Sequence, residues 1–256
     1  MKTTTRVFAL AALASLSAAP ARAQMPEAIK KEKKPEWKSS AAAGLTLTSG
    51  NSETLMATVS ATTDRKWDQN ELSLGADGAY GQNKDRSTGV TSTSAESAHG
   101  FVQYNRLFSE RLYGYGRLEG LYDGVADINY RVTLSPGAGY YFIKNKTVDL
   151  SGEVGPGYVI QSLGGQESDF ATLRVAEKFH YAISDRARIW QSVEWLPQVD
   201  KFDNYIINAE IGIEADITPD KKISLRSFLQ DTYNSQPASG FKKNDMKLVT
   251  ALAYKF

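Results

Sequence analysis

Apolar and polar residues alternate with a period of two in about twelve segments between residue 37 and Phe256. Successive side chains of a strand point to opposite faces of a sheet, so this period predicts β-strands. In the final segment one parity is almost wholly apolar, and it holds Met246, Leu248, Leu252, Tyr254 and Phe256. The other parity holds Asp245, Lys247 and Lys255. One apolar and one polar face, repeated this often, predict a barrel with lipid outside and a wet lumen inside.

The segments have the length that such a barrel requires. About ten residues at roughly 3.3 Å per residue, tilted near 45°, span roughly 23 Å, which matches the apolar band of outer-membrane barrels. The sequence lacks a run of about 18 apolar residues, which excludes a transmembrane helix. Short turns alternate with longer polar connections such as residues 82–93, as expected when both chain ends are periplasmic. We therefore predict an all-β fold, a transmembrane antiparallel up-and-down β-barrel of about twelve strands over residues 37–256.

The first 23 residues have the form of a cleaved signal peptide. Lys2 and Arg6 precede an apolar run, and Ala21-Arg22-Ala23 supplies the small residues of a cleavage site. Removal of residues 1–23 leaves 27 basic and 29 acidic residues, so the charge gives no indication of nucleic-acid binding. Residues 24–36 are interpreted as a basic periplasmic tail, with docking on an anionic envelope surface as the alternative. The predicted location is the outer membrane of a Gram-negative cell, reached by Sec-type export.

The residue types needed for common catalytic and metal sites are scarce. Cysteine is absent, which excludes thiolate metal sites and cysteine catalysis. His99 and His180 are the only histidines, and no G-x-S-x-G motif accompanies them. Scattered carboxylates and two isolated histidines do not form a metal-binding pattern. The sequence therefore predicts no catalytic residue, no cofactor and no metal.

One segment, residues 171–181, fits the alternation less well than the others. The register that turns Val175 and Phe179 toward lipid also turns Glu177 outward, whereas the opposite register would expose three basic side chains. A basic residue at the bilayer midplane costs roughly 2–4 kcal/mol and an acidic one less. We therefore predict the first register, with a local bulge that turns Glu177 inward as the alternative.

The inward parity carries charges of both signs. The candidates for lining the lumen are Arg117, Glu119, Arg131, Glu153, Arg174, Lys178, Glu210 and Arg226. These charges could pair with one another and fill a narrow barrel, because buried charges need partners. They could instead border a polar pore and tune which solutes enter. Twelve strands lie between small filled barrels and 16-stranded porins, so the size of the barrel leaves both interpretations open.

Three stretches resemble one family, the YdiY-like salt-induced outer-membrane proteins, which contain a domain of unknown function. They are Leu45–Thr54, then Tyr130-Arg131 with Gly137–Tyr140, and finally Asp231–Asn234 with the closing Tyr254-Lys255-Phe256. Where the family has Lys-Thr-Asp, this chain has Lys243-Asn244-Asp245. The resemblance runs from about Trp37 to the end. It implies an outer-membrane barrel and a link to salt or osmotic stress, and it carries over no activity or site residue.

The function expected from these observations is non-enzymatic. The protein is predicted to be either a narrow channel for small solutes or ions, or a structural protein of the stressed envelope. The alternative is a barrel-type outer-membrane enzyme acting on lipid or peptide. The expected partners are outer-membrane lipid, lipopolysaccharide and the barrel-assembly machinery, which would recognise the last strand through its end at Phe256.

Overall fold

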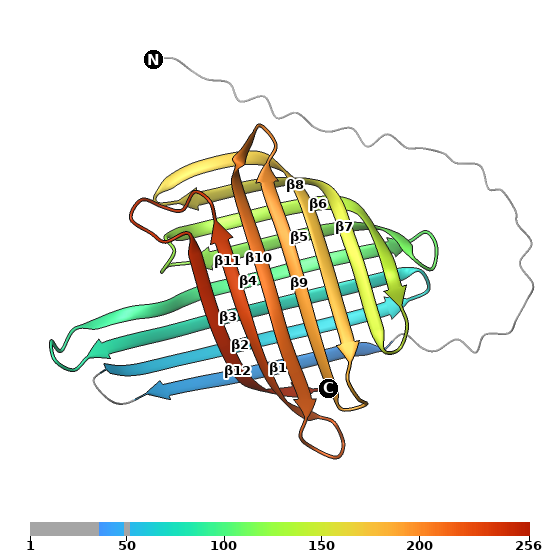
Figure 1. Ribbon diagram of the computed structural model, residues 1–256, viewed down its shortest axis with the longest axis horizontal. Helices are drawn as coiled ribbons and strands as arrows, with labels where there is room; N and C mark the ends of the chain where they lie inside the picture. The colour runs from blue at the N-terminus through green and yellow to red at the C-terminus, as the bar shows by residue number, and fades with distance from the viewer. Residues whose placement is uncertain (1–35, 49–51) are drawn as a thin grey trace, which may run out of the picture. The chain divides into compact units, whose positions relative to one another are not determined.

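The computed structural model describes residues 36–48 and 52–256, and these form a β-barrel (Figure 1). The strands are β1 (Trp37–Thr48), β2 (Ser52–Trp67), β3 (Asn70–Asp85), β4 (Thr91–Leu107), β5 (Leu112–Asp123), β6 (Ile128–Lys144), β7 (Val148–Leu163), β8 (Gln166–Ala182), β9 (Ala187–Gln198), β10 (Lys201–Asp216), β11 (Ile223–Asn234) and β12 (Asn244–Lys255). Each strand pairs with the next, and β12 pairs with β1, which closes the barrel. The predicted antiparallel barrel of about twelve strands is confirmed. The predicted signal peptide and residues 24–35 of the predicted tail lie outside the described residues.

Antiparallel pairing places the strand ends at two rims. Trp37 and Lys255 lie at one end, because β1 and β12 are antiparallel neighbours with Ala41 opposite Tyr254. We call this end the terminal rim, and it also carries the turns at residues 68–69, 108–111, 145–147, 183–186 and 217–222. The opposite end is the distal rim. Its described turns are at residues 86–90, 124–127, 164–165, 199–200 and 235–243.

The alternation in the sequence separates the two faces of the barrel wall. In β7, the outward Val154 and Ile160 are 52% and 46% exposed, whereas the inward Ser151 and Glu153 are 4% exposed. An outer surface of this composition suits contact with lipid chains, and the polar inner surface requires partners inside the barrel. The inward positions are therefore the candidates for a functional site.

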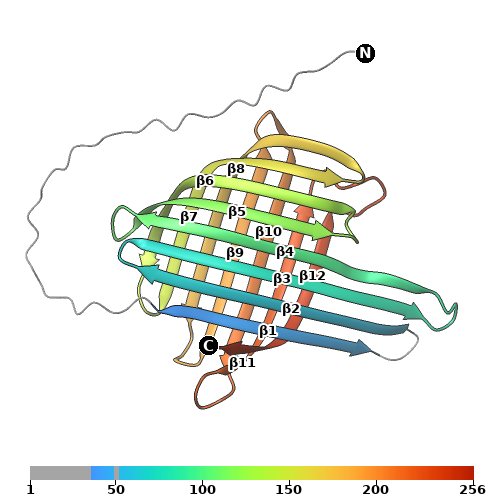
Figure 2. The same ribbon diagram turned by 180° about the vertical axis from the view of Figure 1, so that it is seen from behind.

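The distal connections are shorter than the sequence indicated. Residues 82–93 were expected to form a polar loop, yet β3 continues to Asp85 and β4 begins at Thr91. Their hairpin projects beyond the neighbouring strands in both views (Figures 1 and 2). An antiparallel ladder joins backbone groups, so polar side chains do not end it once the paired strands leave the apolar band. The Asp85 side chain then stabilises the turn by accepting hydrogen bonds from the amides of Ser87 and Thr88.

Glu177 faces outward, as the preferred register predicts. Its strand β8 pairs with β7 without a register shift, with Glu177 opposite Gly152, and it lies opposite Val193 of β9. The alternative of a local bulge at this residue is therefore wrong. The outward parity that holds Val175 and Phe179 also holds this carboxylate.

We expect Glu177→Leu to raise the free energy of unfolding by about 1 kcal/mol, because it removes an acidic side chain from the lipid-facing wall. Urea titration of the folded barrel in lipid vesicles measures this change. Val175→Leu, at the adjacent outward position, is the control and should leave stability nearly unchanged. A loss of stability in Glu177→Leu would show that the carboxylate has a stabilising partner on the outer face.

Candidate functional site in the barrel lumen

The lumen contains a cavity of about 920 Å³. Residues from all twelve strands border it, so it is a space of the barrel as a whole rather than a cleft between two elements. Charged side chains of both signs reach it, among them Arg117, Glu153 and Lys178. The chemistry of the site depends on which of these charges are already paired.

Glu153 on β7 is the centre of a buried network. Its carboxylate accepts hydrogen bonds from Arg174 Nη1 at 2.7 Å and Lys178 Nζ at 3.1 Å, both on β8. It also accepts from Gln103 Nε2 on β4 at 2.8 Å and from Tyr113 Oη on β5 at 3.0 Å. The Glu153 side chain is only 1% exposed. A buried carboxylate is tolerated when neighbours compensate its charge, and here donors from three other strands do so.

Arg174 extends this network to β9. Its Nε donates to Glu194 Oε1 at 2.5 Å, and its Cζ lies 5.1 Å from the ring centroid of Tyr115. A guanidinium held by two carboxylates and an aromatic face has little freedom to move. Arg174 therefore stabilises the inner wall rather than presenting a free charge to the cavity.

Gln103 joins the Glu153 network to an ion pair on β5. Arg117 donates through Nε and Nη2 to Glu119 Oε2 at 2.9 and 2.5 Å, and its Nη1 lies 3.3 Å from Gln103 Oε1. Lys178 Nζ reaches the same Gln103 oxygen at 3.1 Å. This amide thus connects strands that are not adjacent in the barrel, and it ties β4 and β5 to β7 and β8.

His99 on β4 is held between two carboxylates. Its Nδ1 lies 2.8 Å from Asp77 Oδ1 on β3, and its Nε2 lies 3.2 Å from Glu119 Oε1 on β5. A histidine acting as a general base needs one nitrogen directed at a nucleophile. Both nitrogens of His99 contact acids instead, which favours a structural role for this residue.

A second charged cluster surrounds Glu214 near the terminal rim. This side chain is 1% exposed and lies 2.9 Å from Arg188 Nη2, 2.9 Å from Arg226 Nη2 and 2.6 Å from Lys255 Nζ. Lys255 Nζ is also 2.5 Å from Asp216 Oδ1. The cluster joins β9, β10, β11 and β12 on the lumen side. The first network joins β4, β5, β7, β8 and β9 in the same way.

Trp190 on β9 lies beside this cluster. Its Nε1 donates to the carboxylate of Glu210, which also accepts from Gln230 Nε2 at 2.8 Å. Arg226 Cζ lies 5.9 Å from the Trp190 ring centroid. The ring occupies the space over Gly212, where an added Cβ would lie 2.2 Å from Cζ2. Glycine at this inward position therefore makes room for the indole.

The structure groups the eight predicted lumen residues unequally. One network contains Arg117, Glu119, Glu153, Arg174 and Lys178. Glu210 and Arg226 lie together beside Trp190. Arg131 is separate, 6% exposed, with its Nε donating to Gln161 Oε1 at 2.8 Å. The candidates that border the cavity are Arg117, Glu153, Lys178, Glu210 and Arg226.

Uncharged partners were missed by the sequence analysis. Gln103 connects the networks, and Tyr141 Oη on β6 donates to Glu71 Oε2 on β3 at 2.7 Å. Both have the inward parity of their strands, and this signal was available in the sequence. Parity gives the face of a residue but not its partner across the lumen, so the connecting role of Gln103 needed the folded barrel.

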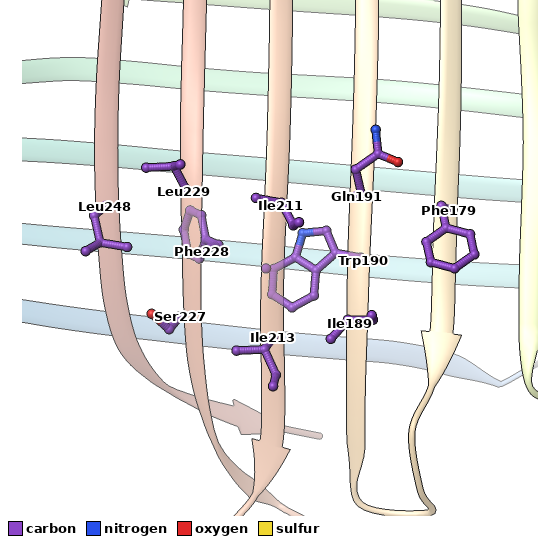
Figure 3. A pocket seen from close by; sticks show the side chains of 11 residues that line it. Phe179, Ile189, Trp190, Gln191, Ile211, Ile213, Ser227, Phe228, Leu229 and Leu248 are labelled. Atoms are coloured by element: carbon purple, nitrogen blue, oxygen red, sulfur yellow. The ribbon is translucent and has the colours of Figure 1, made fainter.

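A smaller hollow of about 370 Å³ lies on the wall formed by β8 to β12 (Figure 3). Its border is largely apolar and consists of Phe179, Ile189, Trp190, Gln191, Ile211, Gly212, Ile213, Ser227, Phe228, Leu229 and Leu248. Most of these residues have the outward parity. A hollow of this composition on the lipid-facing wall suits contact with acyl chains, so the polar lumen remains the candidate site.

Two further observations limit the chemistry of the described residues. Within residues 36–48 and 52–256, no group of three or more histidine, aspartate or glutamate side chains is arranged to hold a metal ion. In the same part of the chain, no helix is long and apolar enough to cross a membrane.

Solved structures of porins and of an autotransporter domain are similar to this chain. The NanC porin matches with a TM-score of 0.50 and 8% identity, over 85% of this chain and 98% of that one. The translocator domain of the autotransporter NalP from Neisseria meningitidis matches with a TM-score of 0.44 and 12% identity, over 86% and 87%. The KdgM porin matches with a TM-score of 0.44 and 6% identity, over 86% of this chain and 99% of that one. The NanC match shows that this chain has the porin-like fold of an outer-membrane barrel.

The sequence comparison gives a family but no characterised relative. Residues 41–256 match a family described as "Protein of unknown function, DUF481". No curated protein matches the chain.

Proposed function

This chain belongs to the DUF481 family of unknown function, and we propose that it is a narrow channel for small polar solutes or ions in the outer membrane. The membership confirms the resemblance to an outer-membrane barrel family of unknown function. One observation carries the proposal: a cavity of about 920 Å³, with charged and polar side chains on its border, remains in the lumen beside the paired charges. Pockets that accept small molecules have volumes of roughly 300–1,000 Å³, so this space suits a small solute and not a polymer.

The enzyme alternative has less support. His99 contacts two carboxylates, and a barrel that cleaves lipid or peptide would need a base beside a nucleophile.

The proposed link to salt or osmotic stress rests on the family resemblance alone. A structural role in the stressed envelope is the preferred function if the folded barrel does not conduct.

The proposal includes an orientation and partners. The terminal rim faces the periplasm, and the outer wall contacts lipid and lipopolysaccharide. The assembly machinery recognises the end of β12, where Phe256 is 70% exposed and its ring stacks on Tyr254 at 6.1 Å. Sec-type export through residues 1–23 precedes this assembly.

Ion conductance in a planar bilayer tests the channel directly. The protein is refolded, and a heat-modifiable shift in gel mobility establishes that the barrel is closed. Discrete conductance steps are the expected result. A folded barrel that stays silent would contradict the proposal and would leave the lumen charges as structural pairs.

We expect Arg226→Gln to shift the reversal potential in a salt gradient toward cation preference. Arg226 borders the cavity, so its replacement removes one positive charge from the cavity wall. Glu214 stays paired with Arg188 and Lys255. Arg131→Gln is the matched control, because Arg131 is buried away from the cavity and should not affect selectivity. Equal shifts in both variants would show that overall charge, and not the cavity wall, determines selectivity.

A further inference from the structure

The cavity is unevenly distributed along the barrel. On β6, β7 and β8 it borders residues near the terminal rim such as Tyr141, Ser151 and His180. Deeper toward the distal rim, the inward Val159 and Thr172 of β7 and β8 are 0% and 1% exposed and do not border it. Packed side chains therefore fill the distal lumen along this part of the wall.

Toward the distal rim the cavity continues along a different part of the wall. The bordering residues nearest that rim come from β2, β3, β4, β11 and β12, and they are Met56, Ala79, Ser97, Gln230 and Lys247. A solute that crosses the barrel through this cavity has to pass the level of these residues.

Lys247 crosses the lumen at this level. From β12 its Nζ reaches Ser97 Oγ on β4 at 3.2 Å and Asp123 Oδ2 on β5 at 3.4 Å. Strands β1, β2 and β3 separate β12 from β4 in the closed sheet, so the contact spans the interior and not a pair of neighbours. The Asp123 carboxylate is itself held in place, because its Oδ1 accepts hydrogen bonds from the amides of Val125 and Ala126.

We propose that Lys247 forms the distal constriction of the channel and determines the size and charge of the solutes that pass. The inference rests on the proposed channel function. The ammonium occupies space at this level and compensates the charge of the Asp123 carboxylate beside it, which weakens the attraction of the opening for cations. Without it, the carboxylates of Asp123 and of the inward Asp245 stand uncompensated beside the opening and attract cations.

The test compares Lys247→Ala with the intact protein in planar bilayers containing potassium chloride. The expected result is an increase of at least about twofold in single-channel conductance, together with a reversal potential shifted toward cation preference. Lys201→Ala is the control. It removes the same side chain near the distal rim, but from the exposed start of β10 and away from the cavity border, so conductance should not change.

Thiol labelling gives a second measurement that does not depend on conduction. The chain has no cysteine, so Ala251→Cys places one thiol on the cavity wall between Lys247 and the terminal rim. In the barrel reconstituted in vesicles, a charged, membrane-impermeant thiol reagent is added on the distal side. The reagent should label this single thiol severalfold faster when Lys247 is also replaced by alanine.

The outcomes separate the two proposals. Equal conductance and equal labelling in barrels that conduct would overturn the role of Lys247 and leave the channel function intact. Higher conductance and faster labelling after Lys247→Ala, in an intact barrel that itself conducts, would support both. Silence in both proteins, with slow labelling in both, would contradict the channel function and the constriction together.

Discussion

Glu153→Ala is expected to lower the free energy of unfolding by about 3–5 kcal/mol, because it leaves buried cations without their shared partner. The carboxylate accepts hydrogen bonds from Arg174 and Lys178 and is 1% exposed. Arg174 keeps Glu194, whereas Lys178 keeps the Gln103 amide as its one hydrogen-bond partner among the described residues. Urea titration followed by tryptophan fluorescence, with gel mobility as a measure of the folded fraction, gives the change.

Two comparisons make this prediction specific. Glu153→Gln keeps an acceptor and the size of the side chain, so its loss should be smaller than that of alanine. Lys221→Ala breaks an exposed ion pair with Asp185 in the terminal turns, and such pairs contribute about 0–1 kcal/mol. The hydrogen bond from Lys221 lowers the pKa of the Asp185 carboxyl, but solvent screens the pair. If Glu153→Ala cost no more than Lys221→Ala, the buried network would not stabilise the barrel.

Gly155→Ala is expected to cost about 3 kcal/mol, the upper end of the range for overpacking, because the added methyl would collide with backbone. Its Cβ would lie 2.1 Å from the carbonyl oxygen of Pro136 and 2.6 Å from the Cα of Gly137, both on the neighbouring β6. Side chains can rotate away from such a contact, whereas paired strands have to separate. The expected results are a lower urea midpoint and a smaller folded fraction on gels.

Gly120→Ala is the matched control for Gly155→Ala. Gly120 on β5 also lies within a strand, but an added Cβ would have no atom within 4 Å. Substitutions at open positions usually change stability by less than about 0.5 kcal/mol, so this variant should behave like the intact protein. Equal losses in both variants would show that the penalty comes from replacing glycine in a strand and not from the close approach of β6.

The glycines show why part of the fold could be predicted and part could not. Gly137, Gly139, Gly155 and Gly157 appear in the sequence as breaks in an alternating pattern, which indicates only that something lies close to the backbone. The structure identifies a different neighbour for each one. Tyr113 lies over Gly139, and the backbone of Pro136 lies over Gly155. The register of β6 with β5 decides the first of these neighbours and its register with β7 the second, and register is not a property of either segment alone.

The distal connections show a different limit. Polar composition over residues 82–93 indicated a loop, because an isolated segment of such residues has no apolar face to bury. In the folded protein the hairpin of β3 and β4 extends to Asp85 and Thr91, since a strand already paired can continue its ladder at little cost.

The sequence by itself determined the strands of this protein and the face on which each side chain lies. The alternation with a period of two is a local pattern, and polar side chains on the lipid-facing side of a strand are destabilising. It placed Glu153, Arg174 and Lys247 inside without a partner for any of them. Only the closed barrel decided those partners. Closure brings Lys247 to Asp123 and Ser97, which lie more than a hundred positions earlier in the chain. The combined register of all twelve strand pairs determines which inward residues share a level, and no segment of the sequence contains that information.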